Sequence, residues 1–320
     1  MGIATSQQLT KYYDQYRDTE VTFTKDIIRA LGLDPRQVYI KCNGGQWPCI
    51  INSTSFMAAK IIVGTKGGAF AALANKDNQN QTVNLRFCFS EQDKDIITFL
   101  VSARVAKMQP YMNSKDLVVV TLQFTQRPPD DLIEIVGRLL EANANAIRRR
   151  EERVVINEDS KRKLGLTKEE CVVIVQGVPR HCVLRDISFS GAKVLLIGLS
   201  QFLANKPSVL RLEFDEPQEV VSINGMIVSA DLIQGRKDIC AVSIKFDETS
   251  IPLPFKLHLN NYLTAVRKTQ LSVTDQLAAA KAAHVQQAQA AAKAQPQANA
   301  QQPSPASPAP AQPASPAQTE

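Results

Sequence analysis

Short runs of apolar and β-branched residues fill the first half of the chain from Val38 onward. Gly, Asn, Asp and Pro residues separate these runs, as turn residues separate the strands of a sheet. Several short strands with turns between them favour an antiparallel barrel or sandwich. We expect strands in the runs 38–40, 50–51, 60–63, 83–89, 96–105 and 117–124, after a partly helical opening segment that ends near Gly32 and Asp34-Pro35.

A helix is predicted to follow this first group of strands. Pro128-Pro129-Asp130 stops the strand pattern and places an acidic residue in the first turn of a helix. The apolar stripe of this helix has a roughly helical period and consists of Leu132, Ile133, Ile135, Val136, Leu139 and Leu140. The helix runs into a cluster of arginines at 148–153, and basic side chains suit a helix C-terminus.

A second strand-rich stretch begins at Cys171 and ends with Phe246, and it is also closed by prolines and a helix, from Pro254 to about Arg267. The two halves can be superposed: a shift of 134 residues lays 38–64 on 172–198 without a gap, and a shift of 133 lays 31–33 on 164–166. The shared order of elements favours two related β-barrels. The alternative is that any two β-rich domains share such alternation.

The length and composition fit two folded domains and a tail. The chain has 320 residues, 44% hydrophobic and 21% charged, which is enough for two packed cores. After Thr274 the sequence is mostly Ala, Gln, Pro and Ser, and the last aromatic residue is Tyr262. We therefore predict an N-terminal domain at 1–140, a helix end and linker at 141–160, a second domain at 161–270 and a disordered tail at 271–320, in which 277–294 can form a transient helix.

Several functions are disfavoured by the composition. The six cysteines form no CxxC pair and are expected to be buried free thiols, and the three histidines lie too far apart for a metal site. We find no nucleophile–base pattern or Walker loop and therefore expect no enzyme. With no signal-peptide core and no long apolar run, a cytoplasmic location without a membrane span is predicted. The net charge of +6 favours anionic partners.

Two elements carry the candidate chemistry. The first is Arg149-x-x-x-Arg153, and the second is the segment from Asp186 through Ser188 to Gly191. Arginine guanidinium groups fit phosphate oxygens and the O6 and N7 atoms of guanine, and they stack on purines. A carboxylate can accept from the N1 and N2 groups of guanine, and a glycine permits either close backbone approach or a positive φ. Together these residues form a possible clamp for a guanine nucleotide.

The pair of motifs R-x-x-x-R and D/N-x-S-x-x-G resembles the PilZ family of cyclic di-GMP receptors over roughly residues 148–267. The resemblance implies a mainly β fold with flanking helices, in which two PilZ-like antiparallel β-barrels are joined by a helix and a linker. It also implies cyclic di-GMP as the ligand, bound by Arg149, Arg153, Asp186, Ser188 and Gly191. Arg148 and Arg150 have no fixed motif role but can add charge for a second, stacked ligand molecule, and Arg148 is taken as a candidate contact.

The first half resembles a degenerate copy of the same domain. At the 134 shift, Asn52, Thr54 and Met57 stand where the second copy has Asp186, Ser188 and Gly191, and at the 133 shift Tyr16 and Glu20 replace the arginines. Without both arginines this copy is not expected to bind the ligand. Chains with two such domains are similar to the spirochaete type of PilZ receptor.

The expected function is therefore a ligand-gated hinge. Cyclic di-GMP would order the linker, fix the orientation of the barrels and expose a surface for an unidentified protein partner, in motility or virulence control as the family implies. Taken alone, the arginine cluster also fits a solvated helix end, and Asp186 and Ser188 fit a simple capped turn. The rival function is binding of nucleic acid through the arginine cluster.

Overall fold

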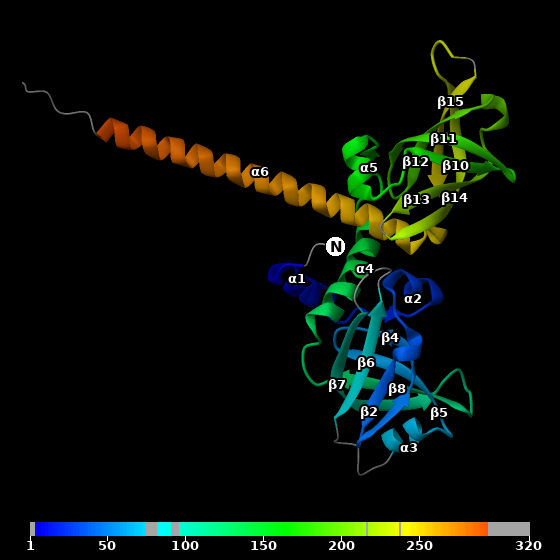
Figure 1. The fold of residues 1–320 in the computed structure, drawn as a ribbon, viewed down its shortest axis with the longest axis vertical. Helices are drawn as coiled ribbons and strands as arrows, with labels where there is room; N and C mark the ends of the chain where they lie inside the picture. The colour runs from blue at the N-terminus through cyan, green and yellow to red at the C-terminus, as the bar shows by residue number, and fades with distance from the viewer. Residues whose placement is uncertain (1–3, 75–81, 91–95, 216, 237, 294–320) are drawn as a thin grey trace, which may run out of the picture. The chain divides into compact units, whose positions relative to one another are not determined.

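The fold is taken from a computed structural model that describes residues 4–74, 82–90, 96–215, 217–236 and 238–293. Antiparallel strands form two sheets in the described chain and are flanked by helices (Figure 1). This confirms the predicted mainly β fold class. Among the described residues, no helix combines the length and the apolar character needed to cross a membrane.

The N-terminal domain is built on an eight-stranded sheet with the order β1-β4-β5-β8-β7-β6-β2-β3. Its buried side chains form one hydrophobic cluster, to which the first half of α4 contributes Leu132, Ile133, Val136 and Leu139. The elements are α1 (Ser6–Tyr16), β1 (Val21–Thr22), α2 (Lys25–Leu31), η1 (Pro35–Gln37), β2 (Tyr39–Cys42), β3 (Gly45–Pro48), β4 (Ile50–Thr54), β5 (Ala58–Gly64), α3 (Gly68–Ala74), β6 (Val83–Ser90), β7 (Ile96–Pro110), β8 (Leu117–Phe124) and α4 (Asp130–Arg148).

The second domain contains a closed barrel of six strands. The strands follow the circuit β10-β13-β14-β15-β12-β11, and β11 pairs back with β10; β9 adds to β11 outside this circuit. The elements are β9 (Val154–Val155), α5 (Glu158–Leu164), β10 (Glu170–Val175), β11 (Val178–Ile187), β12 (Gly191–Ile197), η3 (Ser200–Phe202), β13 (Pro207–Asp215), β14 (Gln218–Leu232), β15 (Ile239–Phe246), η4 (Glu248–Ser250) and α6 (Leu253–Lys293).

Alternating side chains build each barrel core. Along β13, Leu210, Leu212 and Phe214 are buried, and the residues between them face solvent, as expected for a strand with one face on the core. The β10–β11 hairpin turns through Gln176 and Gly177, both at positive φ. The primed turns that join tight hairpins require this conformation.

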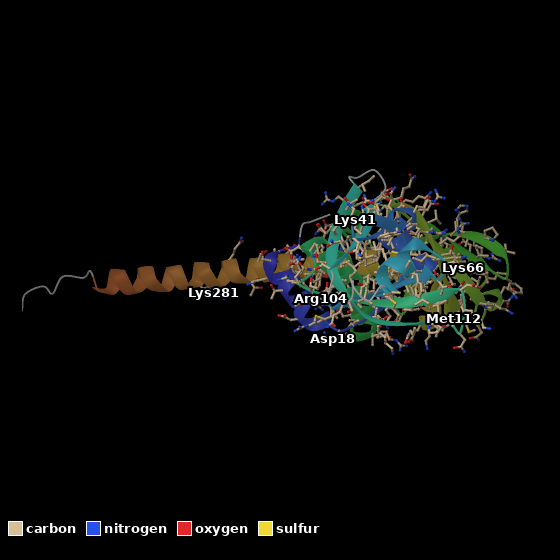
Figure 2. All side chains as sticks on the ribbon, turned by 90° about the horizontal axis from the view of Figure 1, so that it is seen from below. Asp18, Lys41, Lys66, Arg104, Met112 and Lys281 are labelled. Atoms are coloured by element: carbon tan, nitrogen blue, oxygen red, sulfur yellow. The ribbon has the colours of Figure 1, made fainter. Side chains whose placement is uncertain are left out.

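The β7–β8 turn also contains residues in the left-handed region. Met112 and Asn113 have φ values of 46° and 58°, and Met112, labelled in Figure 2, is 83% exposed. The side chain of Lys66, also labelled there, is 92% exposed and forms a 3.7 Å ion pair with Asp116. Pairs this exposed contribute little to stability, so this end of the domain is held by its strand pairing.

The two domains repeat the same strand order. The circuit β1-β4-β5-β8-β7-β6-β2 corresponds to β9-β11-β12-β15-β14-β13-β10, with β3 and β4 in place of the single strand β11. The left-handed caps Gly32 and Gly165 close α2 and α5, and the isolated bridge Leu33–Phe89 matches Leu166–Phe214. The predicted relationship between the halves is therefore confirmed.

The predicted shift of 134 residues is wrong by one residue. The hairpin turns Asn43-Gly44 and Gln176-Gly177 correspond, as do the starts of β5 at Ala58 and β12 at Gly191. Both pairs require the shift of 133 that also relates Gly32 to Gly165. Apolar alternation does not fix this register, because Val172–Val175 is an unbroken apolar run that matches 38–40 at either shift. The β-bulges of β4 and β11 lie at equivalent places, after Ile51 and Leu184, and they also fit the shift of 133.

The helix α6 is longer than the sequence predicted. It begins at Leu253, close to the expected start, but continues to Lys293 instead of ending near Arg267. The segment 271–293, predicted as part of a disordered tail, is thus helical in the structure. Alanine and glutamine are good helix formers and no Gly or Pro interrupts the segment before Pro296. The Pro-rich end, 294–320, lies outside the described residues.

The domain boundaries drawn from the sequence stay a prediction. The structure runs a helix through each of them: α4 crosses 140/141, α5 crosses 160/161 and α6 crosses 270/271. The described chain divides by its contacts into a unit ending at Val266 and a second unit beginning at Arg267. The second unit contains the distal part of α6. The division between the two units, at 266/267, lies near the predicted boundary at 270/271.

Candidate functional site

The arginine-rich linker begins where α4 ends. Arg148 is the last helical residue and is exposed, and Arg149 is the C-cap, whose N–H donates to the carbonyl of Asn145 at 2.8 Å. The N–H of Glu152 donates to the carbonyl of Arg149 at 3.0 Å, so the chain turns at once. Two residues later it enters β9 at Val154. The R-x-x-x-R motif therefore occupies a helix end and a turn.

Strand β9 attaches the end of the linker to the barrel. Val154 pairs with Ile187 and Val155 pairs with Asp186 on β11. This register places Arg153, the residue before β9, beside the end of β11. The burial of Val154 explains the register, because a slip of one residue would expose it.

Arg153 and Asp186 form an ion pair in which Nη1 of the guanidinium donates to Oδ1 of the carboxylate. The Arg153 side chain is 44% exposed and that of Asp186 is 20% exposed. One arginine of the first motif thus directly contacts the acidic residue of the second motif. The sequence predicted that the linker would reach this turn, and the structure brings these two residues together.

Ser188 shapes the turn between β11 and β12. Its N–H donates to the carbonyl of Gly191 at 2.8 Å, and its Oγ donates to the same carbonyl at 3.2 Å and lies 3.2 Å from Oγ of Ser190. Ser188 is fully buried. The Ser188 hydroxyl therefore bonds to groups of its own turn, which is the alternative that the sequence left open for this residue.

Gly191 is required by close packing between two strands. It pairs with Lys245 on β15, and a Cβ atom at this position would lie 2.3 Å from the carbonyl oxygen of Ile244. Of the two reasons that the sequence offered for this glycine, close backbone approach holds, because Gly191 is not among the residues with positive φ. The glycine lets β15 approach the turn that carries the motif.

A further pair of residues belongs to this site. The carbonyl of Arg150 accepts from the N–H of Ser190 at 3.2 Å, and Nη2 of Arg150 forms an ion pair with Glu248. The sequence reasoning gave Arg150 no fixed role and missed Glu248. Glu248 follows the last barrel strand, and its position after Phe246-Asp247 carried no motif that could have identified it.

The N-terminal domain repeats the turn with different charges. At the corrected shift, Ser53, Ser55 and Ala58 occupy the positions of Asp186, Ser188 and Gly191, so the predicted equivalents Asn52, Thr54 and Met57 are wrong. The N–H of Ser55 donates to the carbonyl of Ala58 at 2.8 Å, as Ser188 does to Gly191. Phe56 and Phe189, the next residues, are both 1% exposed. The turn is thus structurally the same in both domains.

Glu20 replaces the second motif arginine in this domain. It accepts hydrogen bonds from Nζ of Lys60 at 2.7 Å and from Oγ of Ser53. These bonds, that of Lys60 above all, lower the pKa of Glu20 below its usual value. A carboxylate at the position of the guanidinium repels phosphate, which agrees with the expectation that this domain does not bind the ligand.

The cysteines and histidines form no other site in the described chain. All six cysteines are free and buried, as predicted, and burial raises the pKa of Cys49 to about 12, which keeps this thiol protonated and unreactive. Among the described residues, no group of three or more His, Cys, Asp or Glu side chains could hold a metal ion.

Comparisons with known proteins match both halves of the chain. A family model described as the PilZN3 domain matches residues 7–143, and one described as the PilZ domain matches residues 147–265. A protein from Treponema denticola named "Cyclic di-GMP binding protein" is 46% identical over 270 residues, which cover 84% of this chain and 85% of the relative.

Solved structures with similarity to the chain include two proteins in complex with c-di-GMP. The PlzA protein of Borreliella burgdorferi is 23% identical with a TM-score of 0.36, and the match covers 80% of this chain and 98% of PlzA. YcgR of Escherichia coli is 13% identical with a TM-score of 0.25, and the match covers 86% of this chain and 100% of YcgR.

Proposed function

This chain is a member of the PilZ family, and on that premise we propose that it is a receptor for cyclic di-GMP and not an enzyme. The ligand binds at the second domain, between the linker residues Arg148, Arg149 and Arg153 and the turn from Asp186 to Gly191. The observation that supports this most directly is the ion pair between Arg153 and Asp186. It joins the two motifs at one place on the barrel surface.

The chemistry of the site suits a guanine dinucleotide. The guanidinium groups of Arg149 and Arg153 supply donors for the two phosphates and for O6 and N7 of guanine. The carboxylate of Asp186 accepts from N1 and N2 of a guanine base, which carry the donors that distinguish guanine from adenine. Arg148 is exposed at the end of α4, where it supplies charge for a second, stacked ligand molecule.

Ser188 and Gly191 act mainly through the shape of the turn. The Ser188 hydroxyl is engaged with Gly191 and Ser190 inside the protein, and Gly191 allows β15 to pack against the turn. Their contribution to binding is then to hold Asp186 and the neighbouring backbone in place. A preformed turn reduces the entropy that the site loses on binding.

The Arg153–Asp186 pair can open without a large cost. The pair is partly exposed, with 44% of the Arg153 side chain and 20% of the Asp186 side chain open to solvent, and each hydrogen bond that a charged group makes to the ligand contributes about 1.5–3 kcal/mol. A ligand phosphate that engages Arg153 therefore compensates for the lost pair. Asp186 is released at the same time and can accept from the guanine base.

The proposed output is a change in the linker and in the relative orientation of the domains. Arg148, Arg149, Arg150 and Arg153 lie within six residues, and the anionic ligand bridges arginines of this segment to the motif turn and orders the segment. The new arrangement then presents a surface to a protein partner in the cytoplasm, in the control of motility or virulence.

Calorimetric titration of the full chain with cyclic di-GMP tests this proposal. Saturable binding is expected, with at least tenfold weaker binding of the linear dinucleotide pGpG and of GMP. Failure to bind cyclic di-GMP, or equal affinity for GMP, would overturn the proposal. The same titration gives the stoichiometry, one or two ligand molecules for each chain.

A further inference from the structure

We propose that Glu248 is a positioning residue for cyclic di-GMP binding: by holding Arg150, it sets the two flanking motif arginines in place. This inference rests on the proposed function of the second domain. It adds to that site a residue outside both motifs, on the short 3-10 helix η4 that follows the last barrel strand.

Arg150 is held to the barrel at two points. Its carbonyl accepts from the N–H of Ser190 at 3.2 Å, and its guanidinium pairs with Glu248. Ser190 is fixed in turn, because its carbonyl accepts from the N–H of Phe246 at 2.8 Å. Arg150 is therefore attached both to the motif turn and to the segment after β15. It directly follows Arg149 and lies three residues before Arg153, so its attachment limits the positions of both.

Glu248 itself is presented by a rigid turn. Asp247 accepts from the N–H of Thr249 at 3.1 Å, from Oγ1 of Thr249 at 2.8 Å and from Oγ of Ser250 at 3.0 Å. Its own N–H donates to the carbonyl of Asn224 at 2.9 Å. These bonds, those from Thr249 first, lower the pKa of Asp247. The carboxylate of Glu248 thus extends from a segment whose backbone is fixed on the barrel.

Comparison with the N-terminal domain distinguishes the backbone contacts around Arg150 from its ion pair with Glu248. Arg17 occupies the position of Arg150, and its carbonyl accepts from the N–H of Phe56 at 3.2 Å, one residue before the equivalent of Ser190. The N–H of Phe124 donates to the carbonyl of Met57 at 2.8 Å, as Phe246 does to Ser190. A similar backbone framework, with the first bond shifted by one residue, is therefore present in both domains.

At the equivalent position of that domain, other contacts replace the ion pair. Phe124 corresponds to Phe246, and two residues after it stands the uncharged Gln126 where the second domain has Glu248. The guanidinium of Arg17 instead contacts Sδ of Met57, with Nε at 3.0 Å, and lies 5.8 Å from the ring centroid of Tyr13. A domain of this fold thus forms without the pair. The pair occurs in the copy that also carries both motif arginines, which points to a role in the site.

Two opposing effects decide the outcome of removing Glu248. Loss of its negative charge strengthens the attraction for phosphate, and loss of the anchor increases the freedom that the linker must give up on binding. The first effect is screened by salt, since the Debye length is only about 6 Å at about 0.3 M ionic strength. The anchor is itself an ion pair between half-exposed side chains, so salt weakens it as well, but its charges are in direct contact and are screened less than charges a Debye length apart. Titrations at that ionic strength therefore reduce the long-range charge effect more than the positioning role.

The test is a set of titrations of cyclic di-GMP into E248Q, R150A, the double variant R150A/E248A and the charge-exchanged variant R150E/E248R. At about 0.3 M salt, each single variant is expected to bind about threefold to tenfold more weakly, the loss associated with one immobilised side chain. The double variant is expected to be no weaker than R150A alone, and the exchanged variant is expected to recover at least half of the loss on a logarithmic scale.

The matched control is E213Q, which removes an exposed glutamate that is paired with Lys168 at 3.7 Å on the same barrel. It is expected to bind like the wild type. Wild-type affinity of E248Q, tighter binding by E248Q, or no recovery in the exchanged variant would each overturn the inference while binding by the wild type still supports the proposed function. Absence of binding by the wild type would overturn the proposed function itself.

Discussion

The Arg153 guanidinium and the Asp186 carboxylate, 33 residues apart in sequence, meet in an ion pair where β9 joins β11. In the N-terminal domain the corresponding positions hold Glu20 and Ser53, and Glu20 pairs with Lys60 instead. One backbone arrangement therefore carries a guanidinium in one copy and a carboxylate in the other. The sign of that charge, together with Tyr16 in place of Arg149, accounts for the different binding expected of the two domains.

The Asp186→Ala variant distinguishes a nucleotide clamp from a nucleic-acid binder. The clamp loses the acceptor for guanine and is expected to bind cyclic di-GMP at least about tenfold more weakly, since a hydrogen bond to a charged group contributes about 1.5–3 kcal/mol. A chain that tracks phosphates through its arginines would instead bind DNA with a steep salt dependence, and its DNA affinity would be unchanged or higher in this variant. Calorimetry with the dinucleotide and fluorescence anisotropy with labelled duplex DNA measure the two affinities.

The control for this experiment is Asp159→Ala. Asp159 is exposed on α5, where it pairs with Lys163 at 2.7 Å, and its removal changes the net charge by the same amount. Equal loss of cyclic di-GMP affinity in both variants would indicate a general charge effect and contradict the specific role of Asp186.

The Gly191→Ala substitution is expected to destabilise the second barrel. The added methyl group would lie 2.3 Å from the carbonyl oxygen of Ile244, so β12 and β15 must separate. Overpacking of this kind costs about 1–3 kcal/mol. Urea unfolding followed by circular dichroism measures the loss. The single tryptophan, Trp47, lies in the N-terminal domain, and its fluorescence should report an unchanged transition.

Gly64→Ala is a suitable comparison, because the nearest atom that its Cβ would meet, the carbonyl oxygen of Asp116, lies at 3.9 Å. This variant is expected to be within about 0.5 kcal/mol of the wild type. A Gly191→Ala protein as stable as the wild type would show that the strands adjust freely at this point.

Glu20 makes the stability of the N-terminal domain depend on pH. Its folded-state pKa lies below the usual value because of Lys60 and Ser53, so its stabilising contribution is present above about pH 4.5, the value for the unfolded chain, and is lost as the pH falls through the lower folded value. In Glu20→Gln this contribution is missing at pH 7, and the acid-induced loss of stability is correspondingly smaller. Urea unfolding monitored by Trp47 fluorescence between pH 3 and pH 7 provides the measurement.

Asp159→Asn provides the reference for this pH series. Its carboxylate also has a lowered pKa, mainly because of Lys163, but it lies in the second domain. The Asp159→Asn substitution is therefore expected to leave the unfolding transition reported by Trp47 unchanged at every pH. An identical pH dependence in Glu20→Gln and wild type would contradict the role given to the Glu20–Lys60 pair.

The sequence predicted the repeat and the motif residues because both depend on local patterns. Alternation marks strands, and the arginine and Asp-x-Ser-x-x-Gly motifs are contiguous. The register between the repeats was wrong by one residue because Val172–Val175 is an unbroken apolar run, which matches the first strand of the other half at either shift. The repeated Ser-Phe of Ser55-Phe56 and Ser188-Phe189 was the signal that could have fixed the register.

The role of Glu248 could not be predicted for a different reason. Its partner Arg150 lies almost a hundred residues earlier, and the contact depends on closure of the barrel between β12 and β15. The sequence predicts only a transient helix at 277–294, because composition favours a disordered tail, whereas α6 runs without a break to Lys293. Alanine-rich segments satisfy the propensity for a helix even where they have little apolar surface to bury.

Titration of cyclic di-GMP into Arg149→Ala plus Arg153→Ala tests the central claim most directly, beside a control that removes Arg162 and Arg236. The control arginines are exposed on the same domain and pair with Asp159 and Asp238, so both proteins lose the same charge. We predict affinity at least about a hundredfold lower for the linker variant, since two charged contacts are lost, and near wild-type affinity for the control. Equal affinities in the two variants would contradict the account.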